Sequence, residues 1–345
     1  MYSPQVIARR TATLATSLGW TPVRSSPERV ARLKEILAEW TIYDEDDNPI
    51  GFREDLPAEL ARAVENEREI CRLDFLYWCE NYAIIRASDD RLIPFKLNRA
   101  QRMLLSVWAK LEELGLAIYV QILKARQLGQ STLIEMAIAH RVQFYPNIKA
   151  VVASSDPRKS ERMAGMMFLC WDEQPWWLKP RQERDKAGEY AKFSHGSEIY
   201  IEHGSRASGI ARGTTPSVVH LSELPDWPNP KDLIDDALMR AIHDDPWKFV
   251  ILESTAKGLH NWWHNKWQAS QKWPDAKFYP VFLPWFVDEQ FWPPPNWLLK
   301  NPVPKGWRPK PETLLHAERA AEAVRTDKLL REHFPQGWTL PVHQM

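Results

Sequence analysis

Apolar residues along the first part of the chain recur at helical spacing. Such a pattern follows Pro27, which suits the first helical position, and predicts a helix over residues 26–40. A second helical pattern covers residues 57–82. The acidic, turn-rich stretch 41–56 between them is interpreted as a linker, and the poorly patterned residues 1–25 as an arm.

From residue 91 onward, short apolar runs alternate with helical patterns. Strands are expected at 117–123, 150–154, 198–202, 217–221, 247–252 and 277–286. Helices are expected at 99–114, 131–144, after 157, at 231–242, after 258 and at 312–332. Strands that alternate with helices form a mainly parallel sheet with helices on its faces. We therefore expect an α/β fold with a helical N-terminal lead-in.

Composition narrows the class of protein. Of the 345 residues 44% are hydrophobic and 26% are charged, which is typical of a globular chain and excludes a disordered or collagen-like one. No apolar run is long enough to span a membrane. Lysine plus arginine and aspartate plus glutamate both number 45, so net charge does not indicate a strongly basic nucleic-acid binder. The three cysteines have no metal-binding spacing and favour a reducing compartment.

Segment 122–132 (ILKARQLGQST) joins the first strand of this region to its helix and has features of a phosphate-binding loop. Such a loop needs backbone N–H groups facing one anion at a helix N-terminus, a cation for the outer phosphates and a hydroxyl for Mg²⁺. Here the backbone of 128–131 would cradle phosphates. Ser131 would ligate Mg²⁺, with Thr132 as a substitute.

The loop departs from the usual G-x-x-x-x-G-K-[ST] pattern at two positions, because Lys124 replaces the first glycine and Gln130 replaces the lysine. Lys124 and Arg126 precede Gly129 closely enough to fold over phosphate oxygens. An ordinary strand-to-helix turn with two surface cations would have the same residues, so the segment alone leaves both interpretations open. The expected nucleotide contacts in the loop are Lys124, Arg126, Gln127, Leu128, Gly129, Gln130, Ser131 and Thr132.

A second apolar run, 218–223 (VVHLSE), ends in an acid. In P-loop ATPases the strand beside the phosphate loop ends in Asp-Glu, where the Asp holds Mg²⁺ through water and the Glu polarises the attacking water. Glu223 fits the role of this Glu, and it is also a candidate metal ligand beside Ser131. Ser222 replaces the Asp, so the metal contact must be weaker or come from elsewhere. An ordinary strand with an exposed Glu at its end is the alternative.

A third apolar run, 251–258 (ILESTAKG), ends in hydroxyl residues and a glycine. Ser254 and Thr255 could sense a γ-phosphate by hydrogen bonding. They also suit a helix N-cap, a position that Ser and Thr favour, and the two roles are compatible.

These three segments, in this order, resemble the ATPase domain of phage terminase large subunits, the motors that pump DNA into procapsids. Segment 124–132 is similar to the family's deviant Walker A, in which Arg-Gln-x-Gly is usual and a displaced lysine is known. Segment 218–223 resembles its Walker B with the catalytic Glu, and 254–258 resembles its coupling motif. The resemblance covers about residues 72–290.

The resemblance implies roles for residues outside the three segments. Segment 75–82 looks like the family's approach to the adenine, and Gln101 matches its adenine-reading glutamine. Phosphoryl transfer depends on charge stabilisation, so an arginine from a neighbouring subunit of a ring could supply the missing cation. Arg212 is the preferred candidate for this role, with Arg206 and Arg158 as alternatives.

The fold that the resemblance implies is an ASCE-type P-loop NTPase. We expect a helical N-terminal arm or lid region at 1–90, the ATPase domain at 91–290, and a Pro/Trp-rich connector with a short helix at 291–345. Full-length family members carry a C-terminal RNase H-like nuclease whose carboxylates bind metal. The acids near the end of this sequence, such as Asp288 and Glu312, fall in the connector or on a surface helix, so no nuclease activity is expected from it.

The expected function is an ATP-hydrolysing subunit that translocates double-stranded DNA into procapsids, with ATP and Mg²⁺ bound. Glu223 would orient water, Lys124 would neutralise the γ-phosphate, and 254–255 would couple hydrolysis to movement. The resemblance implies a homo-oligomeric ring, a portal protein and a terminase small subunit as partners, and the host cytoplasm as the location.

Two other functions stay open. The first is another P-loop DNA translocase or a helicase, although the sequence shows no second complete motor domain. The second is a nucleotide-binding adaptor without turnover, which the replacements at Ser222 and Gln130 favour.

Overall fold

The computed structural model describes residues 27–185, 187–205, 214–243, 245–288, 308, 311–334, 336 and 338. Several predictions lie outside these residues: the arm at 1–25, most of the Pro/Trp-rich connector, and the arginines Arg206 and Arg212.

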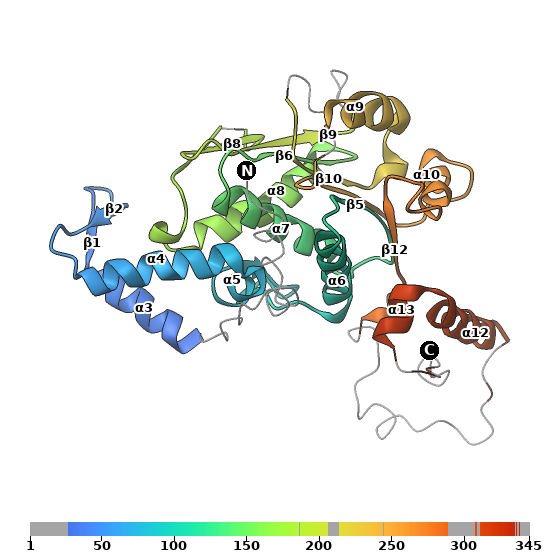
Figure 1. Cartoon of the computed structure of the whole chain (residues 1–345), viewed down its shortest axis with the longest axis horizontal. Coiled ribbons are helices and arrows are strands. Elements are labelled where there is room, and N and C mark those ends of the chain that lie inside the picture. The colour runs from blue at the N-terminus through green and yellow to red at the C-terminus, as the bar shows by residue number, and fades with distance from the viewer. Residues whose placement is uncertain are drawn as a thin grey trace.

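The centre of the molecule is an eight-stranded sheet in the order β12-β5-β11-β10-β6-β9-β8-β7 (Figure 1). Neighbouring strands from β12 to β9 are parallel, and β8 and β7 add an antiparallel edge. The strands are β5 (Ile118–Lys124), β6 (Lys149–Ser154), β7 (Gln182–Arg184), β8 (Tyr190–Phe193), β9 (Glu198–His203), β10 (Val218–Ser222), β11 (Phe249–Ser254) and β12 (Tyr279–Leu283). The predicted mainly parallel α/β class is confirmed. The edge strands β7 and β8 are too short and too polar for their pattern to have predicted them.

Helices cover both faces of the sheet. They are α6 (Arg99–Glu113), α7 (Gln130–Phe144), α8 (Pro157–Asp172), the π-helical η3 (Lys231–Leu238), α9 (Met239–Ala241) and α10 (Trp262–Ser270). Successive side chains of a strand point to opposite faces. Val152 of β6 accordingly packs in the cluster that contains α6, α7 and α8, whereas Val151 packs in the cluster that contains η3 and α10.

The N-terminal part differs from its prediction in two respects. The helix expected at 57–82 is divided into α4 (Ala58–Leu73) and α5 (Phe75–Asn81), because Asp74 leaves the helical conformation and its carboxylate accepts the Tyr77 N–H as the N-cap of α5. The linker prediction for 41–56 is wrong in part, since this stretch contains the antiparallel hairpin of β1 (Thr41–Tyr43) and β2 (Pro49–Phe52). The helix expected at 26–40 is confirmed as α3 (Pro27–Glu39).

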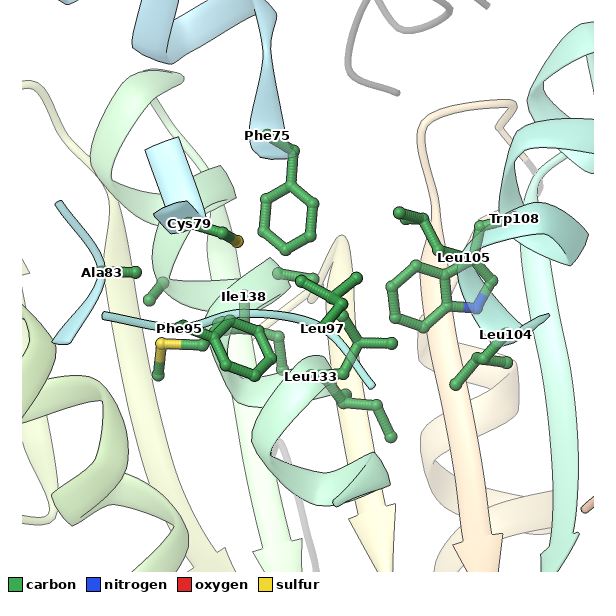
Figure 2. Close-up of a cluster of buried hydrophobic side chains, with 14 of the residues drawn as sticks. Phe75, Cys79, Ala83, Phe95, Leu97, Leu104, Leu105, Trp108, Leu133 and Ile138 are labelled. Atoms are coloured by element: carbon green, nitrogen blue, oxygen red, sulfur yellow. The ribbon is translucent and has the colours of Figure 1, made fainter. Parts of the chain in front are cut away.

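Helix α7 is held between the sheet and the N-terminal helices. Phe75 and Cys79 of α5 lie over Leu133 and Ile138 of α7, and Phe95 lies beside them (Figure 2). All five side chains are buried. Phe95 directly follows a second short hairpin, formed by β3 (Ile84–Arg86) and β4 (Leu92–Pro94). The position of α7 is therefore fixed from both sides. The domain limits at residues 90 and 290 stay predictions.

The C-terminal helix expected at 312–332 forms two helices, α12 (Pro311–Thr326) and α13 (Lys328–His333), beside the β12 edge (Figure 1). Asp327 separates them, and its carboxylate accepts the Leu330 N–H as the N-cap of α13. Among the described helices, none has both the length and the apolarity that a membrane span requires.

Replacement of Leu104 by Ala should lower the free energy of unfolding by about 2–5 kcal/mol, because Leu104 of α6 is completely buried and its loss leaves a cavity. Urea unfolding followed by circular dichroism measures the change. Leu114→Ala, at the end of the same helix and 64% exposed, is the matched control and should change stability by less than about 0.5 kcal/mol. Equal losses in the two variants would contradict the described packing of α6.

Candidate functional site

The predicted segments meet at one edge of the sheet. Lys124 ends β5, Ser222 ends β10, and Glu253 lies at the end of β11 between these two strands. Ser222 pairs in register with Glu253, and Ser254 pairs with Leu123. Ligands of open parallel sheets bind outside the carboxyl ends of the strands, near the point where the strand order reverses. The order β12-β5-β11 is such a point, because β6, which follows β5 in sequence, lies on the far side of β10.

The loop between β5 and α7 has the backbone conformation of an anion-binding concavity. Gln127 has φ +60° and Gly129 has φ +70°, whereas Leu128 between them is not in the left-handed region and Gln130 is the first residue of α7. Left- and right-handed residues that alternate in this way turn successive backbone N–H groups toward one point. The loop at 127–130 therefore has the geometry needed to bind a phosphate oxygen.

The N-terminus of α7 adds to this anion site. The N-cap residue, Gly129, has no side chain that could accept a hydrogen bond from the N–H groups of the first turn. These groups carry the partial positive charge of the fifteen-residue helix α7. Phosphate at a helix N-terminus is stabilised by both effects.

Two side chains at the N-terminus of α6, the N-cap Asn98 and Gln101, hold the loop in place. Gln101 Nε2 donates to the Gly129 carbonyl over 2.7 Å, and Asn98 Nδ2 donates to the Leu128 carbonyl over 3.2 Å. The Gln101 Oε1 atom accepts the Asn98 N–H over 2.9 Å, so both ends of this amide are engaged within the protein. The observed contact of Gln101 is thus with the loop between β5 and α7, and its role in adenine recognition stays a prediction.

A buried carboxylate that the sequence interpretation did not assign lies behind the loop. Ser131 Oγ donates to Glu253 Oε1 over 2.5 Å, and Ser222 Oγ donates to the same oxygen over 3.2 Å. Lys124 Nζ lies 3.7 Å from Glu253 Oε2. Glu253 therefore brings together the two hydroxyls and the displaced lysine.

A buried charge network continues beneath Glu253. His220 Nδ1 lies 2.6 Å from Glu135 Oε1, and His220 Nε2 lies 3.5 Å from Glu253 Oε1. Burial lowers the pKa of His220, but the two carboxylates outweigh it and raise that pKa to about 9. Burial raises the pKa of Glu253, yet Lys124, His220 and the Ser131 hydroxyl hold it at about 2. Burial also raises the pKa of Glu135. Glu253 is thus a carboxylate anion at neutral pH.

Glu223 lies next to this network, but its side chain turns toward α8. Its backbone is left-handed, with φ 56° and ψ 38°, a strained conformation for a residue with a side chain. Its carboxylate forms an ion pair with Lys159 and accepts a hydrogen bond from Ser155 Oγ over 3.3 Å. Despite this ion pair, the Glu223 side chain remains 44% exposed to solvent. Backbone strain of this kind is concentrated at functional positions.

The other predicted site residues take different environments. Arg126 and Gln127 are exposed, whereas Gln130 is buried and donates from Nε2 to the Leu128 carbonyl over 3.4 Å. Ser254 is buried at the end of β11. Thr132 and Thr255 are half-buried, and Arg158 is exposed at the start of α8. Of the upstream cations, Lys124 is therefore the one that the fold brings to the buried carboxylate.

The residues present fit a Mg²⁺ ion bound together with phosphate. In the described ranges no group of three His, Cys, Asp or Glu side chains forms a metal site by itself. Mg²⁺ in phosphate sites needs only one or two protein oxygens, because phosphate and water supply the rest. Ser131 offers a hydroxyl, and Glu253 offers a buried anionic oxygen, Oε2, that has no hydrogen-bond partner among the described residues.

The sequence contained a signal for Glu253 that the motif-based interpretation did not use. Strand β11 (FVILES) is buried along its whole length, and a glutamate in such a strand needs a specific partner. Which partner it has depends on the pairing of β11 with β5 and β10, which no local pattern reveals.

No family model matches this sequence, and no curated protein matches it. Solved structures of phage large terminases are similar to it. The HK97 bacteriophage large terminase has 15% identity and a TM-score of 0.49 over 75% of this chain and 50% of that protein. The Thermus phage P74-26 large terminase ATPase domain has 12% identity and a TM-score of 0.40 over 70% of this chain and 93% of that domain.

A third similar structure is the large terminase of a thermophilic bacteriophage in complex with ATP-gamma-S, with 10% identity and a TM-score of 0.44 over 59% of this chain and 51% of that protein. This chain thus spans about half the length of the HK97 protein. Because identities are this low and every one of these TM-scores is below 0.5, the function has to be inferred from the site's own residues.

Replacement of Gly129 by Ala should weaken nucleotide binding at least tenfold. The left-handed backbone disfavours Ala by about 1–2 kcal/mol, and the new Cβ would lie 2.8 Å from Gln101 Nε2. Titration with a fluorescent ATP analogue measures the affinity. Gly165→Ala, in α8 with nothing within 4 Å of the new Cβ, is the control and should leave the affinity unchanged. Wild-type affinity in Gly129→Ala would refute the loop as the phosphate site.

Proposed function

We propose that this chain is the ATP-hydrolysing motor subunit of a viral DNA-packaging terminase, which translocates double-stranded DNA into procapsids. The observation that carries the nucleotide part is the loop at 127–130, whose alternating backbone precedes an uncapped helix N-terminus and a hydroxyl at Ser131. The resemblance of three ordered segments to terminase motifs supports the packaging role.

In this proposal the loop and its neighbours bind the triphosphate of ATP. The backbone N–H groups of 128–131 would donate hydrogen bonds to the phosphate oxygens. Lys124 and Ser131 both contact the Glu253 carboxylate, so these two side chains lie close to each other. A cation at this place compensates for Gln130, which occupies the position of the usual lysine. Mg²⁺, when bound at Ser131, would neutralise charge on the phosphate oxygens. Arg212 in trans remains the proposed source of the remaining positive charge.

Glu223 is the proposed general base. Its position at the end of β10, next to Ser222, places it at the sheet edge that carries the phosphate loop. In the described conformation Lys159 and Ser155 hold its carboxylate. Because the Glu223 side chain is 44% exposed, water can reach it, and its carboxylate would accept the proton that hydrolysis releases.

The proposed coupling segment, 254–258, is joined to the segment that follows Glu223. Lys257 forms an ion pair with Asp226, and the Asp226 N–H donates to the Glu223 carbonyl over 3.0 Å. A displacement of Ser254 or Thr255 by a bound phosphate would therefore be transmitted to the backbone of the general base. This connection supports a role of 254–255 in coupling.

The proposed partners are double-stranded DNA, a portal protein, a terminase small subunit and further copies of this chain in a ring. They rest on the resemblance and not on charge, since the sequence has no net charge. A nucleotide-binding adaptor without turnover is the second candidate, favoured by Ser222 and Gln130 at positions that usually carry an acid and a lysine.

Glu223→Gln should reduce the rate of ATP hydrolysis at least a hundredfold and leave ATP binding intact, because the amide cannot take a proton from water. Phosphate release measured with Mg²⁺, with and without DNA and procapsids, tests this. Glu183→Gln, on the exposed edge strand β7, is the matched control. Wild-type turnover in Glu223→Gln would refute the base, and binding without hydrolysis by the wild type under all conditions would establish the adaptor.

Lys124→Ala and Arg126→Ala should each lower ATPase activity about tenfold or more, since a hydrogen bond to a charged group contributes about 1.5–3 kcal/mol. Gln130→Ala should have a much smaller effect. Thermal unfolding of each variant separates loss of activity from loss of folding, which matters for Lys124 because of its buried partner Glu253. If Gln130→Ala proved the most damaging of the three, the displaced cation would be the wrong assignment.

A further inference from the structure

In P-loop ATPases, the aspartate that holds Mg²⁺ through water lies at the end of the strand that corresponds to β10. Here Ser222 occupies that position, and a carboxylate lies on the neighbouring strand. Glu253 is the register partner of Ser222 on the neighbouring parallel strand, β11. The Ser222 hydroxyl donates to Glu253 Oε1 over 3.2 Å. The carboxylate on β11 therefore lies next to the side chain that stands in the acid's usual place.

The same carboxylate orients the proposed metal ligand. A hydroxyl that ligates a cation must direct its lone pairs at the metal, so its proton has to be donated elsewhere. Ser131 donates its proton to Glu253 Oε1 over 2.5 Å, which leaves its lone pairs directed away from Glu253. Partners of this kind, which orient a ligand and raise its basicity, typically change metal affinity by about 10–100-fold.

One oxygen of Glu253, Oε2, has an ion-pair partner in Lys124 but accepts no hydrogen bond from the described residues. Glu253 is fully buried, and within the described residues its Oε2 atom accepts no hydrogen bond. The nearest cation, Lys124 Nζ, lies at 3.7 Å, beyond hydrogen-bond distance. A buried anionic oxygen left without a hydrogen bond is unfavourable unless a ligand completes its environment. Next to a hydroxyl and a phosphate loop, a divalent cation is that ligand.

We propose that Glu253 supplies the carboxylate of the Mg²⁺ site from β11, in place of the acid missing at Ser222. Its Oε1 accepts the Ser131 proton and so positions that hydroxyl, and its Oε2 is the oxygen available to the cation. This assignment rests on the proposed ATPase function and extends it to a residue outside the motifs that suggested the family. The alternative is a purely structural role, in which Glu253 only balances the charges of Lys124 and His220.

The chain contains a matched control for the structural role. Glu135 is also fully buried and pairs with the same His220, over 2.6 Å, but its described contacts include neither Ser131 nor the loop. Glu135→Gln therefore disturbs the buried charge network as Glu253→Gln does. Only Glu253→Gln removes the acceptor of the Ser131 hydroxyl.

The experiment measures Mn²⁺ binding to the full chain by electron paramagnetic resonance, in the presence of saturating ATP-gamma-S, with nucleotide affinity in EDTA measured in parallel. Mn²⁺ affinity should fall at least tenfold in Glu253→Gln and stay within twofold of the wild type in Glu135→Gln. Nucleotide affinity in EDTA should change little in either variant. The double variant S222D/E253Q, which returns an acid to β10, should regain most of the Mn²⁺ affinity.

Equal Mn²⁺ affinity in Glu253→Gln and the wild type overturns the assignment of Glu253 but not the proposed function. Equal losses in Glu253→Gln and Glu135→Gln overturn it as well, in favour of the structural role. A wild-type chain that binds no nucleotide in EDTA overturns the proposed function, and the assignment with it. Should Glu253→Gln fail to fold, the charge-conserving variants Glu253→Asp and Glu135→Asp decide: a tenfold loss of Mn²⁺ affinity in the first alone supports the assignment, and equal affinities overturn it.

Discussion

The hydrogen bond from Ser131 to the buried carboxylate of Glu253 is the contact on which the site depends. It joins the N-terminus of α7 to the middle of the parallel sheet, across 122 residues of sequence. An ionised carboxylate in the interior is tolerated only when charges and donors surround it. Lys124 of β5, Ser131 of α7, and His220 and Ser222 of β10 provide these. The contact therefore requires β5, β11 and β10 to be neighbours in the sheet.

The fold keeps the loop rigid from several directions. Helix α7 is packed between the sheet and α5, and the loop carbonyls accept hydrogen bonds from Gln101 and Asn98 of the α6 N-terminus. A loop held in this way has little conformational entropy left to lose when it binds an anion. Gln101, which the resemblance links to the adenine, is here part of the support of the loop between β5 and α7.

Gln130 and Ser222 depart from the usual phosphate-loop motifs in opposite senses of charge, so the two departures can be explained together. Gln130 removes a cation from the usual place in the loop, and Ser222 removes an anion from the usual place on β10. Lys124 and Glu253 restore one charge of each sign from neighbouring positions, 3.7 Å apart. In the proposed site, two charge carriers have thus moved from their usual positions in the sequence to neighbouring ones. A search for a fixed pattern misses such a site because the pattern records positions in sequence and the chemistry depends on positions in space.

The sequence by itself determined the fold class, most strands and helices, and the place of the loop between β5 and α7, because these follow from periodicity and from a strand, a turn and a helix that are contiguous in the chain. Local capping signals at Asp74 and Asp327, which divide two predicted helices, were also present in the sequence. Only the tertiary structure decided that Glu253 faces Ser131, that Gln101 binds the loop, and that Glu223 pairs with Lys159. These contacts join residues 28 to 122 positions apart. The order in which parallel strands assemble sets them, and no local pattern of residues encodes that order.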